Sequence, residues 1–289
     1  MKRAVIASLA LALLLAAAGC GGGSSSNNTT TSSGGGSGGG TSTGSALPPT
    51  MHSGALTVGL DPPAVGFQVG TLRGSKVINP TGFEIDLAKA IARKLGIPAG
   101  HITWEKVPFD TLFRPGPKPF DFAFEEATIT PQRQKVVDFS SSYFDANQGV
   151  LLNKDATAPK NQADLKKMTL CAQTATTGLD FVQHQLKATK VQIYTTTSAA
   201  FSAVQVGRCN AFVMDVPIVA SQKKSRPSAY GPVAGQIVTN EKYGAVLAKD
   251  SKLTPLVSKA IDQLNADGTI GKLQKKWFHL DVSQVPVLK

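Results

Sequence analysis

Residues 81–96, TGFEIDLAKAIARKLG, decide the fold of this chain. Their apolar side chains recur every four positions, at Phe83, Leu87, Ile91 and Leu95. This period places one apolar stripe along a helix, and Gly96 is a typical residue just past a helix end. The earlier stretch LTVGL, at residues 56–60, predicts a short buried strand. The globular part of the chain therefore begins with a strand and an amphipathic helix.

Strands and helices alternate along the rest of the chain. The pattern predicts further strands at residues 120–124, 169–173 and 210–214. It predicts further helices that begin after Thr130 and at residues 178–187, 198–206, 253–265 and 270–277. Thr130 is a typical N-cap residue, and Pro131 is typical of a first helical position. Strands that alternate with helices favour an α/β fold built on parallel sheets.

Composition bounds the class of protein. The chain has 289 residues, of which 42% are hydrophobic and 17% charged, as expected for a globular protein with a core. The formal net charge is +11, but the basic residues are scattered in ones and twos, without a nucleic-acid-binding motif. We therefore expect no nucleic-acid partner, and we favour a solvated basic surface near anionic lipid.

The N-terminus has the features of a secretory signal. Lys2 and Arg3 precede an uncharged apolar run at residues 5–18, which is shorter than the roughly 20 residues of a membrane span. The run ends in AAAGC, which resembles a bacterial lipobox with Cys20 as the lipidated residue. We predict a lipoprotein signal peptide at residues 1–20. The alternative is ordinary signal cleavage that leaves Cys20 as a free thiol.

Residues 21–53 consist mainly of Gly, Ser, Asn and Thr, and no charged residue occurs between Arg3 and Asp61. A segment with so little to bury is expected to stay disordered. We predict a flexible tether between a lipid anchor and the globular part, which would hold the protein outside the cytoplasm at the cell membrane.

Six segments in order resemble family 3 of the bacterial extracellular solute-binding proteins, which serve polar amino-acid ABC importers. The segments are residues 81–96, 127–143, 173–177, 207–215, 243–247 and 267–278. The resemblance covers about residues 54–281. It implies a two-lobed periplasmic-binding-protein type II fold. Lobe 1 is expected at residues 54–146 plus 243–285 and lobe 2 at residues 147–242. Two crossovers, near Asn147-Gln148 and Thr239-Lys242, are expected to form the hinge.

The resemblance assigns Arg133 to the carboxylate of an amino-acid ligand, assisted by Thr128 and by Thr176. A planar guanidinium can hold both oxygens of a carboxylate, and Arg133 lies in the first turn of the helix after Thr130, where an anion is favoured. The alternative is that Arg133 pairs with a surface carboxylate. Ala175 stands where the family usually has glycine, a residue that tolerates more backbone conformations.

The ligand ammonium needs a carboxylate partner, because a charge out of water needs compensation. The resemblance assigns this role to Asp215, which follows the strand at residues 210–214. Ligands in open α/β sheets bind at such carboxyl ends. The alternative for Asp215 is a turn or helix-capping residue. Asp61 follows the strand at residues 56–60 in the same way and is expected to contact the side chain or ammonium of the ligand.

Glu125 and Glu126 stand where the family usually has small residues. Adjacent strand residues point to opposite faces, so we expect one glutamate, Glu126, in the cleft and the other on the flank. A further cleft carboxylate exceeds what one ammonium needs, which suggests a basic amino acid as ligand. The alternative is that Glu126 pairs with a cation of the protein.

Phe67 and Phe109 resemble pocket-wall positions, with burial in the core as the alternative for both. Gln173 is expected to face the ligand side chain.

Cys171 and Cys209 both fall in lobe 2, where some family members place a cysteine pair. Outside the cytoplasm such a pair favours a disulfide, and two free buried thiols are the alternative. The histidines show no metal-ligand spacing, and no phosphate loop or nucleophile elbow occurs, so we expect no metal or cofactor.

The resemblance therefore implies the substrate-binding component of an ABC importer: a monomeric, non-enzymatic lipoprotein that passes its ligand to a membrane permease. An enzyme on the same fold, similar to cyclohexadienyl dehydratases, is one alternative, with Glu125 or Glu126 as general acid. A ligand-sensing lipoprotein is another.

Overall fold

The structure of the protein is a computed structural model that describes residues 47–278 and 285–289. The predicted signal peptide at residues 1–20 with its Cys20, and residues 21–46 of the predicted tether, lie outside these residues. In the described part of the chain, every helix is too short or too polar to span a membrane.

A ten-stranded sheet runs through the described residues, in the order β2-β3-β4-β1-β5-β10-β6-β9-β7-β8. Its strands are β1 (Leu56–Leu60), β2 (Val69–Arg73), β3 (Lys76–Thr81), β4 (Ile102–Lys106), β5 (Phe122–Ala123), β6 (Val137–Leu152), β7 (Leu170–Gln173), β8 (Val191–Tyr194), β9 (Ala211–Asp215) and β10 (Val233–Ala248). β1 is parallel to β4 and β5, and β7 is parallel to β8 and β9. The predicted α/β class is confirmed. We call β1 to β5, with the segments that follow each of them, the first half of the sheet, and β7 to β9, with the segments that follow each of them, the second half.

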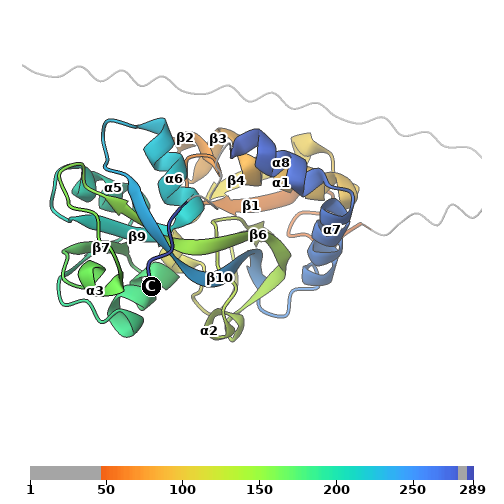
Figure 1. The fold of residues 1–289 in the computed structure, drawn as a ribbon. Helices are drawn as coiled ribbons and strands as arrows, with labels where there is room; N and C mark the ends of the chain where they lie inside the picture. Colours follow the sequence, from red (N-terminus) through yellow and green to blue (C-terminus); the bar gives the residue numbers. More distant parts are fainter. Residues whose placement is uncertain (1–46, 279–284) are drawn as a thin grey trace, which may run out of the picture. The chain divides into compact units, whose positions relative to one another are not determined.

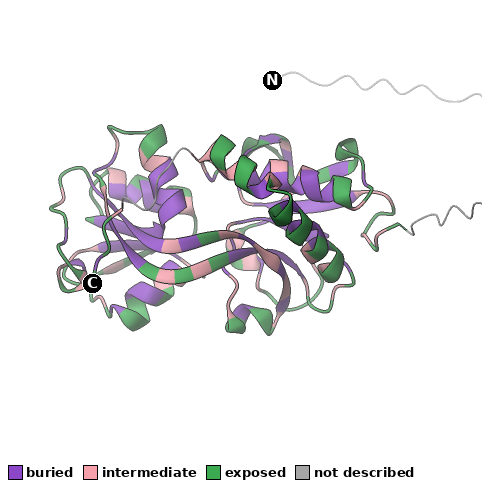
Figure 2. Ribbon diagram, turned by 45° about the vertical axis from the view of Figure 1, so that its right-hand side comes forward, coloured by how far each residue is buried: buried purple, intermediate pink, exposed green. Residues whose placement is uncertain are grey.

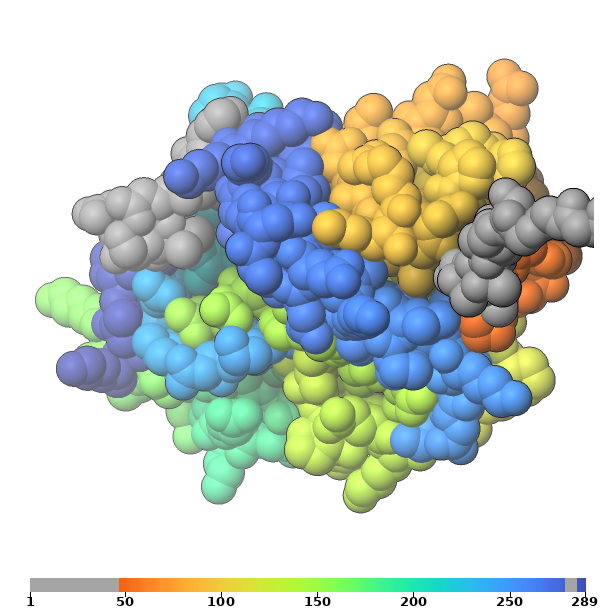
Figure 3. Space-filling model, turned by 90° about the vertical axis from the view of Figure 1, so that its right-hand side faces the viewer, coloured from red at the N-terminus to blue at the C-terminus, as the bar shows by residue number. Residues whose placement is uncertain are grey.

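The helices are α1 (Phe83–Lys94), α2 (Pro131–Gln134), α3 (Gln162–Leu165), α4 (Thr177–Asp180), α5 (Thr197–Gln205), α6 (Val216–Ser225), α7 (Thr254–Ala266) and α8 (Thr269–Trp277). α1 buries the predicted stripe, since Phe83, Leu87 and Ile91 have no exposed surface. Before it, Gly82 has a φ of 139°, and a Cβ there would lie 2.0 Å from the carbonyl oxygen of Phe67. α7 and α8 pack on α1, and Figure 3 shows these C-terminal helices (blue) against the surface that carries α1 (orange and yellow).

β6 and β10 join the two halves of the sheet. Each has 16 residues, and they pair antiparallel as they pass from one half to the other (Figure 1). In Figure 2, the buried stretches of both strands are interrupted by intermediate and exposed residues, which include Asp145 of β6 and Asn240 of β10. Their register shifts between Ile237 and Glu241, where the side-chain oxygen of Asn147 accepts the N–H groups of Thr239 and Asn240 at 3.0 and 3.1 Å. This irregularity lies where the resemblance implies the hinge.

Two predicted elements differ in the structure. The strand expected at residues 120–124 narrows to β5, and the chain leaves the sheet soon afterwards because Glu126 has a positive φ of 49°. The helix expected at residues 178–187 begins as α4 and continues as a π-helical turn at Phe181–Gln185.

The last described residues, 285–289, pack on the second half of the sheet. Val287 forms a parallel bridge with Gln236 of β10, and the backbone N–H of Leu288 donates to the carbonyl of Gln236 at 2.9 Å. The side chain of Leu288 is buried against β10 and the core of this half. The C-terminus therefore ends beside the second half, although α7 and α8 pack against the first.

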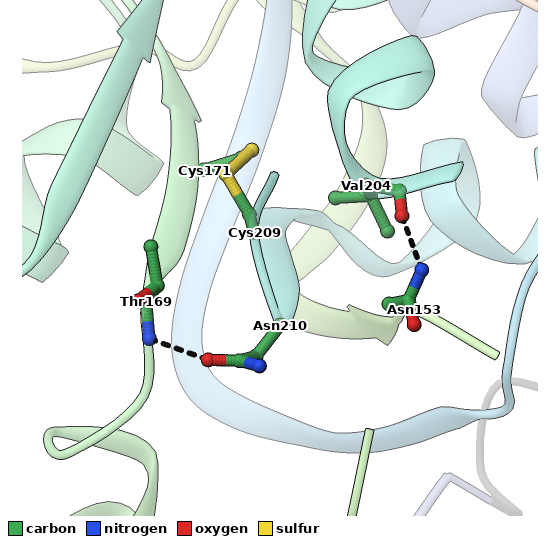
Figure 4. The surroundings of a disulfide bond; sticks show 6 residues. All are labelled: Asn153, Thr169, Cys171, Val204, Cys209 and Asn210. Atoms are coloured by element: carbon green, nitrogen blue, oxygen red, sulfur yellow. Dashed lines mark hydrogen bonds between the residues drawn. A yellow bond between two sulfur atoms is a disulfide. The ribbon is translucent and has the colours of Figure 1, made fainter. Parts of the chain in front are cut away.

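The predicted disulfide between Cys171 and Cys209 is confirmed. Cys171 lies in β7 and Cys209 directly before β9, with an S–S distance of 1.98 Å (Figure 4). Asn210 supports this junction, because its side-chain oxygen accepts the backbone N–H of Thr169 at 2.8 Å. The bond closes a loop with a sequence separation of 38 residues.

We predict that replacing both cysteines, Cys171→Ala with Cys209→Ala, lowers the free energy of unfolding by about 3–4 kcal/mol. In the chain-entropy model, the removed crosslink restores freedom to the unfolded state. Urea unfolding of the double variant, with and without reductant, measures this loss. The variant should not respond to reductant, whereas the parent protein should. Equal stability of the oxidised parent and the variant would contradict the prediction.

Candidate functional site

A cavity of about 260 Å³ is lined by residues from both halves of the sheet. Its walls come from the carboxyl ends of the parallel strands, where loops and helices begin, as in other open α/β sheets. The predicted binding residues that line it are Asp61, Phe109, Glu126, Thr128, Arg133, Gln173, Thr176 and Asp215.

Phe67 is the predicted site residue that the structure does not bring to the cavity. Its side chain has no exposed surface and packs among Phe83, Phe144, Tyr243 and Phe278, with ring centroids 4.6–6.1 Å away. The core interpretation holds for this residue, because α1, β6, β10 and the C-terminal segment converge on it.

Arg133 reaches the cavity from α2, with Thr130 as the N-cap residue. Its guanidinium donates to the carbonyl of Thr128 at 2.7 Å and to that of Ala175, in the second half, at 2.9 Å. The ring of Phe113 lies 4.1 Å from the guanidinium carbon. An arginine has five N–H donors, so these contacts leave donors for a ligand oxygen. Burial lowers the pKa of the guanidinium to about 10, and the charges of Asp215 and Glu241 oppose this shift.

Asp215 lies at the end of β9 and precedes α6, but its side chain does not cap that helix. Its carboxylate accepts hydrogen bonds from the side-chain amide of Gln148 and the hydroxyl of Tyr243, both at 2.5 Å. Burial, with the nearby charge of Glu241, raises the pKa of Asp215 to about 7, against the opposing effects of both donors and of Arg133. The capping alternative is therefore wrong, and a buried carboxyl lines the cavity beside a buried guanidinium.

Glu241, in β10, connects the two halves and was not predicted as a site residue. Its carboxylate accepts the hydroxyl of Thr128 at 2.8 Å, the hydroxyl of Thr177 at 2.6 Å and the amide of Gln148 at 2.9 Å. Thr128 belongs to the first half, and Thr177 begins α4 in the second. The hydroxyl of Thr128 is therefore bonded within the protein. The only sequence signal for Glu241 was its position in the predicted crossover near Thr239-Lys242.

Thr176 and Gln173 are also bonded within the protein. The hydroxyl of Thr176 accepts the N–H of Leu179 at 3.1 Å, as an N-cap does, and donates to the carbonyl of Gln173 at 2.7 Å. The side-chain oxygen of Gln173 accepts the hydroxyl of Thr197 at 2.5 Å. Each residue lines the cavity, but these contacts fix its orientation.

Asp61 has a protein cation as its partner. Its carboxylate pairs with the ammonium of Lys106 and accepts the backbone N–H of Phe109 at 3.0 Å. Its own N–H donates to the side-chain oxygen of Gln68 at 3.0 Å. Lys106 also lines the cavity, although no local sequence pattern predicted it as a site residue.

Glu125 and Glu126 both line the cavity, so the predicted alternation between cleft and flank is wrong. Alternation requires a continuous strand, and β5 ends at Ala123. Glu126 accepts the side-chain amide of Gln68 at 3.2 Å and donates its N–H to Glu84 at 3.1 Å. The alternative, in which Glu126 pairs with a cation of the protein, is not found among the described residues.

Glu125 is the least compensated carboxyl of the site. Its side chain is buried, with the residue 3% exposed, and in the described part of the chain neither carboxyl oxygen has a hydrogen-bond partner. Burial raises the pKa of Glu125 well above its usual range, against the charge of Lys106. Burial raises the pKa of Glu126 likewise, and the charge of Glu84 adds to the shift. Among the described residues, no group of three His, Cys, Asp or Glu side chains is arranged to hold a metal.

Ala175, whose carbonyl accepts Arg133, has a positive φ of 62°. This left-handed conformation costs an L-residue with a Cβ roughly 1–2 kcal/mol, whereas glycine adopts it readily. Ala175 therefore carries a backbone strain that glycine at this position would not.

We predict that Ala175→Gly raises the free energy of unfolding by about 0.5–1 kcal/mol, because relief of the left-handed strain exceeds the added entropy of the unfolded chain. The matched control is Ala199→Gly, the same change inside α5. This control should cost roughly 0.5–1 kcal/mol. Urea unfolding measures both, and a loss of stability in Ala175→Gly would contradict the prediction.

The known proteins that this chain resembles in sequence and in structure are described as amino-acid-binding proteins. The chain is 30% identical over 205 residues to "ABC transporter arginine-binding protein 1" of Escherichia coli (strain K12), covering 68% of this chain and 81% of that protein. The solved structure "An ancestral arginine-binding protein bound to arginine" matches with a TM-score of 0.67 and 32% identity, covering 78% of this chain and 98% of that one.

A second similar structure is described as "the ancestral amino acid-binding protein AncCDT-1, a precursor of cyclohexadienyl dehydratase". It has a TM-score of 0.67 and 32% identity, over 78% of this chain and 95% of that one. The predicted type II periplasmic-binding fold is confirmed by these neighbours. Residues 56–280 match the family described as bacterial extracellular solute-binding proteins, family 3, and the chain belongs to this family.

Proposed function

We propose that the protein binds a free amino acid in this cavity and delivers it to the permease of an ABC importer. The observation that carries this proposal is that Arg133 and Asp215 line one cavity from different halves of the sheet. The guanidinium suits the carboxylate of an amino acid, and the carboxylate of Asp215 suits its ammonium. In a site largely removed from water, both charges of the ligand need such partners.

We infer that the ligand is taken up by closure of two lobes, residues 54–146 plus 243–285 and residues 147–242. The irregular pairing of β6 and β10 is the proposed hinge. Two contacts between the lobes support this inference: Arg133 of lobe 1 donates to Ala175 of lobe 2, and Glu241 of lobe 2 accepts from Thr128 of lobe 1. A ligand shifts such an equilibrium only through contacts that differ between the open and closed states.

We propose a basic amino acid as the ligand. The carboxyls of Asp61, Glu125 and Glu126 line the cavity in addition to Asp215, which the ligand ammonium already occupies in this proposal. A side-chain cation would compensate Glu125, which has no hydrogen-bond partner in the described residues. The names of the E. coli relative and of the ancestral structure, both described as arginine-binding, support this class.

We propose that the protein acts outside the cytoplasm as a lipid-anchored monomer. The support is the sequence alone: a signal-like apolar run, the lipobox-like residues before Cys20 and the Gly/Ser/Thr tether at residues 21–53. A flexible tether of 33 residues, 21–53, would span roughly 30 Å on average, which would give the binding domain room to meet a permease.

An enzyme is the second candidate. A buried carboxyl with a raised pKa is suited to general-acid catalysis, and Glu125 meets this description. One similar structure is named as a precursor of cyclohexadienyl dehydratase. We favour binding without turnover, because Arg133 and Asp215 match the two charges of an amino acid and need no reaction to be satisfied. A ligand-sensing lipoprotein would use the same cavity, and it differs only in the membrane partner.

The proposal predicts that arginine and lysine bind and stabilise the protein, that glutamine binds more weakly and that glutamate does not bind. Calorimetry and thermal shift with these ligands measure this, since a bound ligand stabilises by RT ln(1 + [L]/Kd). Arg133→Ala should abolish binding, whereas Arg114→Ala, which removes an exposed arginine, should not. Tight glutamate binding without a response to basic ligands would contradict the ligand class. Turnover of prephenate or arogenate would favour the enzyme.

The pKa of about 7 for Asp215 predicts how binding depends on pH. An ammonium binds the ionised carboxyl, so affinity should rise with pH through about 7 and fall up to tenfold per unit below it. Asp215→Asn should weaken binding at pH 8 and flatten this profile. Calorimetry between pH 5.5 and 8.5 measures both proteins, and wild-type affinity that falls as pH rises would contradict the prediction.

A further inference from the structure

Three neighbouring parallel strands place charged residues at one edge of the sheet. β4, β1 and β5 are adjacent, and Leu60 of β1 is in register with Lys106 of β4. The carboxyl ends of these strands therefore bring Lys106, Asp61 and Glu125 to the same side of the cavity, which all three line. We call them the acidic edge, together with Glu126.

Lys106 is the cation of the acidic edge. Its ammonium pairs with Asp61, and the two side chains are only 25% and 19% exposed. The remaining contact of the Asp61 carboxylate is the backbone N–H of Phe109. The charge of Glu125 also acts on Lys106 and raises the pKa of its ammonium, against the larger lowering effect of burial. The ammonium of Lys106 therefore lies beside the same carboxyls, those of Asp61 and Glu125, that a cationic side chain of a ligand would contact.

We propose that Lys106 is a specificity-determining residue whose ammonium competes with the side-chain cation of the ligand for Asp61 and Glu125. This inference rests on the proposed function and deepens it. The acidic edge has three carboxyls and one ammonium on the cavity wall, so Lys106 neutralises part of the attraction for a second cation. Its presence limits the preference for cationic amino acids and permits neutral polar ones of similar length.

Arginine and citrulline test this competition. They have nearly the same shape, but the guanidinium of arginine is charged and the ureido group of citrulline is neutral. The affinity ratio of the two ligands therefore isolates the side-chain charge. We expect Lys106→Met to raise the arginine-to-citrulline ratio roughly tenfold or more, since one competing charge is removed from a half-buried site. Lys106→Arg retains the charge and should keep the wild-type ratio.

Lys76→Met is the matched control. Lys76 is an exposed lysine in register with Glu105 of β4, with which it forms an ion pair, and its side chain is 48% exposed. The control changes the net charge equally but should leave the ratio unchanged. Calorimetry on the intact globular protein measures all four ratios, and circular dichroism confirms that each variant is folded. If Lys106→Met does not fold, Lys106→Gln replaces it.

Two results would overturn this inference alone. An unchanged ratio in Lys106→Met would show that the ammonium does not compete. A loss of citrulline affinity without a gain for arginine would show that Lys106 instead donates to a ligand carbonyl. A wild-type protein that binds neither these ligands nor any other amino acid would overturn the proposed function and this inference with it. If the wild-type protein binds amino acids but either of the first two results is obtained, the inference about Lys106 fails and the proposed function stands.

Discussion

The site depends on one buried guanidinium, that of Arg133. A cation removed from water is stable only if nearby groups compensate it. The structure supplies the carbonyls of Thr128 and Ala175 as acceptors and the carboxylates of Asp215 and Glu241 as opposing charges. Because these groups come from both halves of the sheet and from β10, the position of the guanidinium constrains the relative placement of all three. The left-handed conformation of Ala175 follows from the same constraint, since it directs a carbonyl toward Arg133.

Local patterns in the sequence predicted much of the fold. The four-residue period found α1, the apolar run found β1, and Thr130-Pro131 marked the start of α2. Each of these signals depends on residues within a few positions of one another, where spacing alone determines which side chains share a face. The charged residues at strand ends were informative for a related reason. In a parallel sheet all carboxyl ends meet at one edge, so Asp61 and Asp215 could be predicted to line the cavity even though the register of the strands was not known.

Other features depend on long-range packing and could not be predicted in this way. Phe67 and Phe109 looked alike in sequence, but the C-terminal Phe278 packs on Phe67 and makes it a core residue. The two glutamates were assigned by strand alternation, which fails once Glu126 adopts a positive φ. Lys106 carries no local signal, and Glu241 carries only its position in the predicted crossover. The partners of both are distant in sequence: Asp61 for the first, Thr128 and Thr177 for the second.

Two charge systems divide the cavity, and their balance differs. Around Arg133, one cation faces the carboxylates of Asp215 and Glu241, and Glu241 accepts three hydrogen bonds within the protein. An amino acid with one charge of each sign leaves the net charge of this group unchanged. Around Lys106, the carboxyls outnumber the ammonium, and hydrogen bonds from Gln68 and Tyr143 compensate Glu84 and Glu126 but do not reach Glu125. A buried, unpaired carboxyl either keeps its proton or requires a cation. In the proposed function, the first system would therefore suit any amino acid and the second would respond to the side chain, so that the two properties could be changed independently.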